Sequence, residues 1–264
     1  MSCHCSVIFF GMPRASEPFI ESVTRALLEP LSAAGLTCRV TGRLNLPDMV
    51  ENPRSGERGR IIDARRLTDR FSDVTLVAQD EAAISEDFRF FSGFPDRWND
   101  GYNSLRNMLH QQRSLRAGWE AAANDASDLY IFLRPDLVYL DSLRDAITTV
   151  LQAGGPTIST PAWLTCRGLN DRIAITNSRP IAEAYATRMT LAQRFVREYG
   201  KGLHAERLLA YAIGTGQIRH VFFAARAARC RIDAKVVAED FTIKWRVKAR
   251  TQARLRLAPR TFAA

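Results

Sequence analysis

The chain has 264 residues, of which 46% are hydrophobic and 25% are charged, so it is long enough for one large α/β domain with a substantial core. Its formal net charge of +9 favours anionic partners, such as nucleotides, nucleic acid or an anionic membrane surface, but does not choose among them. We expect neither a membrane-spanning segment nor a secretory signal, because no apolar run approaches about eighteen residues and the first residues lack the signal pattern.

The first forty residues predict a strand, a helix and a second strand. Residues 6–10 are a short apolar run closed by Gly11, which is typical of a buried strand. Residues 37–41 predict a second strand, and Pro30 is expected to bend the last turn of the helix between them. A strand–helix–strand opening implies that the two strands pair in parallel. The apolar side chains that define the helix are Phe19, Val23, Leu27 and Leu31.

Two loops are expected in the middle of the sequence. Residues 45–60 carry prolines and glycines among charged residues and therefore predict a loop. Residues 90–102 predict a loop rich in aromatic side chains, which could either pack against the sheet or stack on a sugar ring. A strand at 74–78 lies between the two loops, and a helix at 104–122 follows the second one.

The most informative stretch is residues 128–137, an apolar run that stops at Arg134, Pro135 and Asp136. A run bounded in this way is typical of a buried strand, and Pro135 cannot donate a hydrogen bond to a sheet. We therefore expect a central strand to end on Asp136. Ligands of open α/β sheets bind beyond the carboxyl ends of the strands, so Arg134 and Asp136 are candidates for binding a phosphate-bearing substrate.

The remaining sequence alternates helices and strands before it becomes basic. A long helix is expected to begin at Ser178 and to end near Gly200. From Lys244 to Arg260 the chain carries seven basic residues and no acid, which indicates either a solvated tail or an arm that docks on an anionic membrane or a partner. The other expected elements are helix 143–151, strands 157–160 and 172–176, helix 204–213 and strand 218–223.

Several of these segments together resemble a poorly characterised group of GT-A-type glycosyltransferases that take part in polysaccharide and surface-glycan assembly. The resemblance covers residues 6–225 and depends on the order of the motifs, since none of them is specific alone. The motifs are Gly11-Met12-Pro13-Arg14, the strand followed by Arg134-Pro135-Asp136, Asn170-Asp171-Arg172-Ile173-Ala174-Ile175, a helix containing Tyr185, and His204-Ala205-Glu206-Arg207-Leu208-Leu209.

The resemblance implies a GT-A-like fold, with a Rossmann-type mixed, mostly parallel sheet flanked by helices. This nucleotide-sugar transferase domain would span residues 1–240, and the basic C-terminal arm would span 241–264. The implied activity is transfer of a sugar from a nucleotide-diphosphate donor to a glycan or polysaccharide acceptor. The sugar, the acceptor and the stereochemistry are not encoded in any motif of the sequence.

Many enzymes of the resembled kind bind a divalent cation through an Asp-x-Asp motif at a strand end. In this chain Arg134 occupies the place of the first aspartate, which leaves Asp136 as the candidate ligand. One carboxylate beside a guanidinium is a poor site for Mn²⁺ or Mg²⁺, which prefer several oxygen ligands. Arg134 could instead bind diphosphate oxygens directly, so the sequence leaves metal dependence open.

An inverting transfer needs a carboxylate that accepts the proton of the acceptor hydroxyl. Asp171 is the first candidate for this catalytic base and Glu206 the second. Asn170 and Arg172, which belong to the same motif as Asp171, are expected to contact substrate. The alternative is that Asp171 orders a loop by pairing with Arg172, and that Glu206 stabilises the first turn of a helix.

The remaining candidates for nucleotide or substrate binding come from two other segments. Backbone at Gly11 could approach a nucleotide, and Arg14 could contact a phosphate or a base, unless the two residues form only a solvated turn. Asn107 and Gln111 are four residues apart, so they share one face of a helix and could reach donor or acceptor hydroxyls.

Other functional classes are less well supported. The sequence contains no nucleotide-binding loop of the Gly-x-x-x-x-Gly-Lys type, no Gly-x-Ser-x-Gly elbow and no Gly-x-Gly-x-x-Gly fingerprint. A nucleic-acid-binding protein and a non-catalytic scaffold on a degenerate transferase fold stay as alternatives, although no nucleic-acid recognition motif is present. Five cysteines without a framework spacing favour a cytoplasmic protein, which the basic arm could place at the inner face of a membrane.

Overall fold

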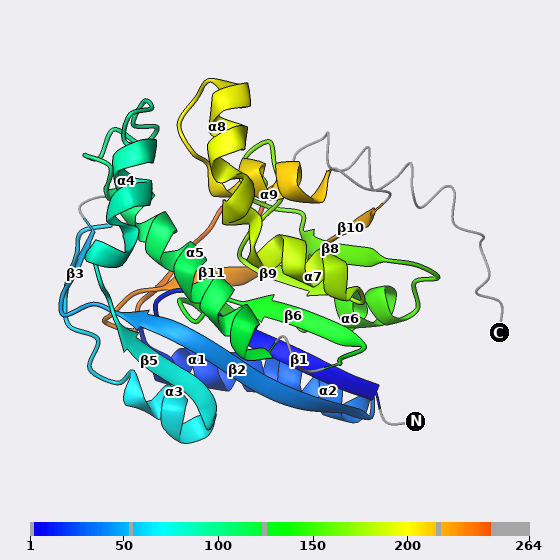
Figure 1. Cartoon of the computed structure of the whole chain (residues 1–264). Coiled ribbons are helices and arrows are strands. Elements are labelled where there is room, and N and C mark those ends of the chain that lie inside the picture. Colours follow the sequence, from blue (N-terminus) through cyan, green and yellow to red (C-terminus); the bar gives the residue numbers. More distant parts are fainter. Residues whose placement is uncertain (1–2, 53–54, 123–125, 215–217, 244–264) are drawn as a thin grey trace.

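The computed structural model describes residues 3–52, 55–122, 126–214 and 218–243, and Figure 1 shows helices on both faces of a central sheet. The strands are β1 Cys3–Phe9, β2 Leu36–Leu46, β3 Val50–Asn52, β4 Glu57–Gly59, β5 Asp73–Ala78, β6 Leu129–Leu133, β7 Leu137–Tyr139, β8 Thr157–Pro161, β9 Ile173–Thr176, β10 Arg219–Phe223, β11 Ala227–Cys230 and β12 Val236–Val237. The helices are α1 Ser16–Val23, η1 Thr24–Leu28, α2 Glu29–Ala33, α3 Arg65–Arg70, η2 Ala82–Ile84, α4 Ser85–Phe91, α5 Asn103–Ala122, α6 Arg144–Leu151, α7 Arg179–Ala186, η3 Arg188–Leu191, α8 Ala192–Tyr199 and α9 Ala205–Ile213.

The central sheet has seven strands in the order β10-β8-β9-β6-β1-β2-β5. Its neighbouring strands run parallel, except that β9 is antiparallel to both β6 and β8. The parallel pairing predicted for the first two strands is confirmed in β1 and β2. The prediction of a Rossmann-type sheet that is mixed, mostly parallel and flanked by helices is also confirmed.

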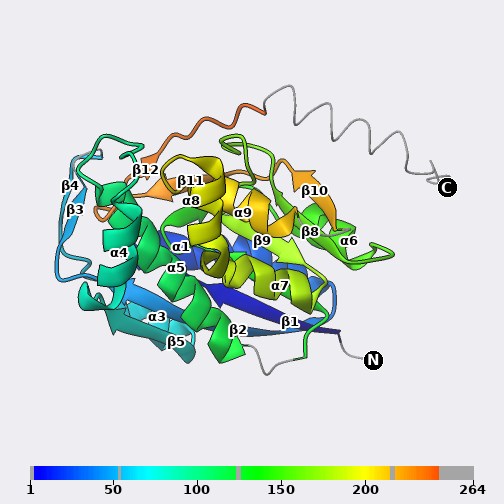
Figure 2. The same cartoon turned by 45° about the horizontal axis from the view of Figure 1, so that its top comes forward.

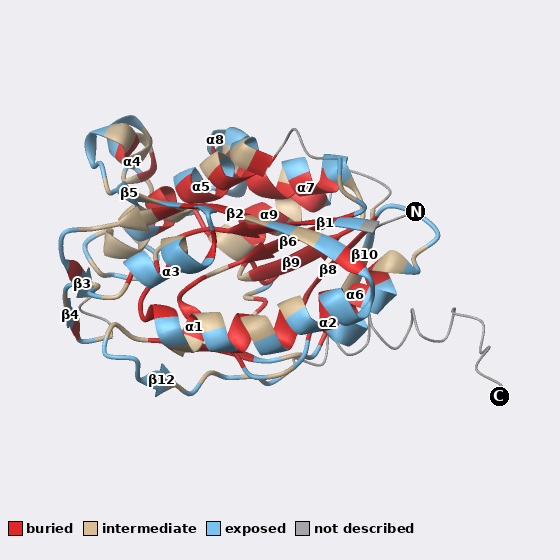
Figure 3. Ribbon diagram, turned by 90° about the horizontal axis from the view of Figure 1, so that it is seen from below, coloured by how far each residue is buried: buried red, intermediate tan, exposed pale blue. Residues whose placement is uncertain are grey.

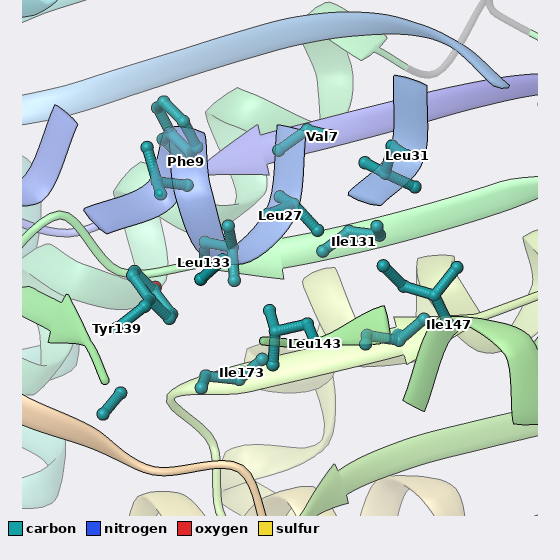
Figure 4. Packing of buried hydrophobic residues seen from close by; sticks show 14 of the residues in the cluster. Val7, Phe9, Leu27, Leu31, Ile131, Leu133, Tyr139, Leu143, Ile147 and Ile173 are labelled. Atoms are coloured by element: carbon teal, nitrogen blue, oxygen red, sulfur yellow. The ribbon is translucent and has the colours of Figure 1, made fainter. Parts of the chain in front are cut away.

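The central strands β6 and β9 are fully buried because helices cover both faces of the sheet. Successive residues of β1, such as Val7 and Ile8, belong to hydrophobic clusters on opposite sides of the sheet. Figure 4 shows the first cluster, in which Leu27 and Leu31 from the α1–α2 segment point toward β1 and β6. On the opposite face Trp119 of α5 and side chains of α7 and α9 form the second cluster. Figure 3 shows this pattern as buried strands between helices with exposed outer faces.

A π-helical turn, η1, comes just before Pro30, the residue at which a bend was predicted. Proline has no backbone N–H to donate, so the preceding turn is free to widen. The Glu29 N–H donates to the Thr24 carbonyl, five residues back, and α2 resumes at this point. The segment α1–η1–α2 therefore stays continuous enough to bury one apolar face on the sheet.

The loop predicted for residues 45–60 is wrong, because β2 extends to Leu46 and β3 pairs with β4 in an antiparallel hairpin. Gly56 adopts the left-handed conformation, with a φ of 67°, just before β4 begins. A residue far away in the sequence holds the hairpin in place, since the Arg231 Nη1 donates to Glu57 Oε2 at 2.6 Å. That tertiary contact has no trace in the local sequence pattern.

The single helix predicted from Ser178 to Gly200 is also wrong. The chain forms α7, then the short turn η3, then α8. The break coincides with Arg188, whose side chain is fully buried and whose Nη1 donates to the Tyr185 carbonyl at 2.6 Å. A buried guanidinium needs such acceptors, and a continuous helix would already use that carbonyl. The aromatic loop predicted for 90–102 likewise begins inside α4, which ends at Phe91.

The strand expected to end on Asp136 ends earlier, at Leu133, and β7 begins at Leu137. β7 joins a second, three-stranded sheet of order β12-β11-β7, which the sequence did not predict. Arg134 and Asp136 therefore lie in the turn between the two sheets. Figure 2 shows β11 and β12 beside the end of the central sheet, where they approach the β3–β4 hairpin.

Candidate active site

A cleft of about 470 Å³ lies over the edge of the sheet at which the parallel strands end. Arg14 follows β1, Gln79 follows β5 and Asp136 follows β6, and all three line this cleft. Arg172 lines it too, because the antiparallel strand β9 begins at the same edge, where its first residue pairs with Leu133. The topology thus brings four separate loops to the position at which open α/β sheets bind ligands.

The charged side chains around the cleft form two groups with different surroundings. We call the first the arginine cluster and the second the carboxylate cluster. The members of the arginine cluster are Arg14, Glu57, Arg134, Asp136, Arg229 and Arg231, and those of the carboxylate cluster are Asp171, Glu206, Gln111 and Arg188. Arg172 and Glu239, which form an ion pair of 3.2 Å, also line the cleft.

Asp136 is held by Arg134 in a two-point ion pair. The Arg134 Nε donates to Asp136 Oδ1 at 2.8 Å, and the Arg134 Nη2 donates to Oδ2 at 2.6 Å. Burial alone would raise the pKa of Asp136, but Arg134, with Arg229 and Arg14 beyond it, holds that pKa well below its usual range. Asp136 is therefore ionised, and each of its oxygens already has a cationic partner.

These surroundings do not fit a divalent cation at Asp136. Mn²⁺ and Mg²⁺ need several oxygen ligands, whereas Asp136 offers one carboxylate whose two oxygens face a guanidinium. Among the residues that the structure describes, the group of side chains close enough to hold a metal is a different one, formed by Cys166, His204 and Glu206.

Two other members of the arginine cluster have buried N–H groups without a hydrogen-bond acceptor. These groups are the Nη1 of Arg14 and the Nε of Arg229. The first lies 3.7 Å from a carboxylate oxygen of Glu57, and the second lies 3.8 Å from Glu239, so each has a counter-charge at more than hydrogen-bond distance. Burial lowers the pKa of Arg229 to about 10, which leaves it protonated at neutral pH. Both groups could therefore donate to an anion in the cleft.

Glu57 organises this side of the cleft, although it lies on the β3–β4 hairpin rather than on the central sheet. It accepts hydrogen bonds from Arg231 and from the Ser55 hydroxyl, at 2.6 and 2.7 Å. Burial opposes its ionisation, but Ser55, Arg14 and Arg231 together lower the pKa of Glu57 below its usual value. One buried carboxylate therefore positions two arginines.

The carboxylate cluster has the opposite electrostatic character. Asp171 is buried, and its Oδ2 accepts from Gln111 at 3.3 Å and lies 3.5 Å from the Arg188 Nη2. Burial, and then the charge of Glu206, raise the pKa of Asp171, while Arg188 and other cations oppose the rise. A buried carboxylate with a raised pKa is suited to exchange a proton, which is the property required of a catalytic base.

Glu206 lies in the first turn of α9, close to the ring of His204. Burial opposes ionisation of Glu206, but His204 and then Arg172 lower its pKa. Trp98, from the aromatic loop, lines the cleft and stacks on His204 with the ring centroids 5.8 Å apart. Phe91 of the same region is buried in the core instead, so the aromatic segment contributes both to packing and to the cleft.

The other predicted site residues divide between the cleft and its supports. Asn107 and Gln111 share one face of α5, as their spacing predicted, and both line the cleft. Gly11 is buried next to Gln111 and does not line the cleft; its φ is 97°, and its N–H donates to the Ser114 hydroxyl at 2.7 Å. Asn170 is buried, donates to the Trp163 carbonyl at 2.8 Å and accepts from the Arg172 N–H. Asn170 therefore shapes the loop that carries Asp171.

Sequence reasoning missed Arg229, Arg231, Glu239 and Glu57. Arg229 and Arg231 lie two residues apart in and just after β11, so they point to the same side of that strand. The presence of three arginines among small residues from Arg226 to Arg231 was a signal that could have identified them. Glu57 and Glu239 gave no comparable signal, because acidic residues outside a motif are usually solvated.

No protein-family model matches the chain, and no curated protein matches it. Solved structures with similar folds include three transferases. The galactosyltransferase LgtC, in complex with donor and acceptor sugar analogues, is 14% identical with a TM-score of 0.44, and the match covers 82% of this chain and 73% of that one. Mouse xyloside xylosyltransferase 1 is 12% identical with a TM-score of 0.37, and the match covers 84% of this chain and 85% of that one. An inositol-1-phosphate CTP transferase from T. maritima is 10% identical with a TM-score of 0.39, and the match covers 94% of this chain and 97% of that one. At such low identities and TM-scores the function cannot be transferred, so we base it on the residues of the cleft.

Proposed function

We propose that the protein is a glycosyltransferase that moves a sugar from a nucleotide-diphosphate donor to a glycan acceptor. The observation that supports this most directly is the pair of buried guanidinium N–H groups, on Arg14 and Arg229, that lack acceptors in a cleft at the carboxyl ends of parallel strands. A buried donor without an acceptor costs free energy, on the order of 1–3 kcal/mol, unless a ligand supplies the acceptor. The oxygens of a diphosphate would do so.

We infer that the arginine cluster, rather than a metal at Asp136, neutralises the leaving diphosphate. In a direct displacement the acceptor oxygen would form a bond to the anomeric carbon, and the bond from that carbon to the diphosphate oxygen would break. Negative charge then develops on the diphosphate, beside Arg14 and Arg229. The proton of the acceptor hydroxyl would pass to Asp171, whose raised pKa suits it to receive a proton.

The proposal is tested by titrating the full chain with UDP, GDP, dTDP, ADP and CDP by calorimetry and thermal shift. Each titration is carried out once with EDTA and once with Mn²⁺. We expect at least one diphosphate to bind and to raise the unfolding temperature, with similar affinity under both conditions. Binding that requires Mn²⁺ would contradict the arginine-based model, and a lack of binding by every diphosphate would contradict the transferase function.

Other parts of the sequence interpretation stay proposals. None of the described helices is long and apolar enough to cross a membrane. Residues 244–264, on which the proposed membrane docking depends, lie outside the described residues. Phe241, which the sequence assigned to the arm, packs edge-on against Trp163 with ring centroids 5.2 Å apart.

The alternative function, nucleic-acid binding, predicts steeply salt-dependent binding to DNA or RNA, which a gel-shift series can measure.

A further inference from the structure

Cys166, His204 and Glu206 meet beside the cleft, and none of them belongs to the arginine cluster. Within the described parts of the chain, their potential ligand atoms form a group in which all atoms lie within 4.8 Å of one another. Cys166 and Glu206 line the cleft, and the side chain of His204 is buried beside them, with 7% of it exposed. The three residues come from two segments, the loop after β8 and the start of α9.

The ring of His204 is placed as a ligand would be. Its Nδ1 lies 3.0 Å from Glu206 Oε2, yet the geometry is not that of a hydrogen bond, and Nδ1 is buried without any hydrogen-bond partner. When Nδ1 carries no proton, its lone pair and the carboxylate oxygen are both acceptors, and a cation bound between them would satisfy both. Stacking of Trp98 on the ring limits its rotation away from Glu206.

The loop that carries Cys166 is held in an unusual backbone conformation. Leu164, Cys166 and Arg167 have φ values of 45°, 48° and 66°, in the left-handed region that residues other than glycine rarely adopt. Backbone strain of this kind persists only where the surrounding structure enforces it.

Contacts with the first turn of α9 hold the Cys166 loop in this backbone conformation. The Leu169 N–H donates to the Glu206 carbonyl at 2.9 Å, and the Arg207 Nε donates to the Cys166 carbonyl at 3.3 Å. A Cβ atom at Gly168 would lie 2.0 Å from the Glu206 carbonyl oxygen, so only glycine permits this approach. The loop and the helix are therefore fixed together, with the thiol beside the carboxylate.

We propose that Cys166, His204 and Glu206 bind a divalent transition-metal ion of the Zn²⁺ class. A thiolate, an imidazole nitrogen and a carboxylate oxygen suit Zn²⁺, whereas Mg²⁺ and Mn²⁺ prefer oxygen ligands alone. Ligand atoms around tetrahedral zinc lie about 3.2–3.8 Å apart, given bonds of about 2.0–2.3 Å, so the group needs only small side-chain adjustments.

Binding would release the thiol proton of Cys166 to solvent. The two negative charges of the thiolate and the carboxylate would then balance the charge of the ion. This site goes beyond the proposed function and does not depend on it, because the donor is assigned to the arginine cluster.

The first test measures metal in the full chain, purified without a histidine tag. The protein is incubated with ZnCl₂, desalted and analysed by elemental mass spectrometry, and a second sample is loaded with Co²⁺ for absorption spectroscopy. We expect one ion per chain, together with a thiolate-to-cobalt charge-transfer band. Substoichiometric metal, or a cobalt spectrum without that band, would overturn the assignment.

Single variants then locate the ion. Cys166→Ser and His204→Gln should each weaken Zn²⁺ binding by at least about a hundredfold in a competition assay with a chromogenic chelator. Cys38→Ser is the matched control, since Cys38 is a partly exposed cysteine that lies outside this group. Unchanged affinity in the first two variants, or a loss in the control, would contradict the proposed site.

A measurement on the unaltered protein keeps the test decisive if a variant does not fold. Zn²⁺ should slow alkylation of Cys166 by iodoacetamide at least about tenfold, measured by peptide mass spectrometry, and should leave alkylation of Cys38 unchanged. Equal rates at Cys166 with and without Zn²⁺ would overturn the proposal. Nucleoside diphosphate binding in EDTA, measured in parallel, would be unaffected by this result, so failure of the metal site and failure of the transferase function can be told apart.

Discussion

The arginine cluster and the carboxylate cluster share one cleft but stabilise their charges in opposite ways. In the arginine cluster, the pKa of Asp136 is held well below its usual range by Arg134 and by the arginines beyond it. In the carboxylate cluster, burial and the nearby Glu206 raise the pKa of Asp171. Both aspartates are almost completely buried, so burial alone does not explain the difference.

The difference follows from how closely a cation approaches each aspartate and from the like charge of Glu206 near Asp171. Asp136 accepts two short hydrogen bonds from one guanidinium, whereas the single arginine beside Asp171 lies at 3.5 Å. When two carboxylates have environments that push their pKa values apart, they are suited to different chemical roles. Asp136 is suited to hold arginines in place, and Asp171 is suited to exchange a proton.

The largest effect is expected from Asp171→Asn. An amide cannot accept the acceptor proton, so sugar transfer should fall by about a hundredfold to ten-thousandfold, while binding of the nucleoside diphosphate is retained. Steady-state transfer assays and calorimetry on the same preparation check both parts. Glu120→Gln, on the exposed end of α5, is the matched control and should transfer normally. Full activity in Asp171→Asn would remove this residue from the chemistry.

The second effect concerns stability. Asp136→Asn leaves the buried Arg134 without its counter-charge and should lower the free energy of unfolding by about 3–5 kcal/mol, measured by urea denaturation. Asp141→Asn breaks a similar two-point pair with Arg226 that is exposed, so it should cost less than about 1 kcal/mol. Equal losses in the two variants would show that the Arg134–Asp136 pair contributes no more than a surface ion pair.

The third effect concerns the donor. Arg229→Gln removes a buried cation that we assign to the diphosphate, so the affinity for the preferred nucleoside diphosphate should fall by about tenfold to a hundredfold, or roughly 1.5–3 kcal/mol. The comparison is Arg226→Gln, three residues earlier on the chain and exposed, which should bind normally. A similar loss in both variants would indicate a general charge effect rather than a contact.

The smallest effect is a displaced pH profile. Transfer requires the ionised form of Asp171, so kcat/KM for a nucleotide sugar should decline as the pH falls through the pKa of this residue. Because burial raises that pKa, the decline should begin above the ordinary aspartate value of about 3.9. The affinity for the donor should stay constant over the same interval, because Asp136 remains ionised there. A decline confined to the ordinary aspartate range would contradict the assignment of Asp171.

The sequence alone determined the parts of the fold that local patterns encode. The apolar runs of β1 and β6 were recognisable as buried strands, and the spacing of Asn107 and Gln111 predicted that they share one face of α5, which the structure places at the cleft. Pro135 indicated that a strand ends in this stretch, although β6 ends at Leu133 rather than on Asp136. These features depend on neighbours within a few residues, which a linear sequence displays directly.

Only the tertiary structure decided which charges meet. Glu57 contacts Arg231, which lies 174 positions away, and neither residue belongs to a recognisable motif. Cys166 approaches Glu206 because glycine at position 168 lets a loop press against the first turn of α9. The partner of Asp171 is Arg188, at the break between α7 and α8, rather than its neighbour Arg172. Such contacts depend on how segments that are distant in the sequence pack around the sheet, and a local sequence pattern does not encode that packing.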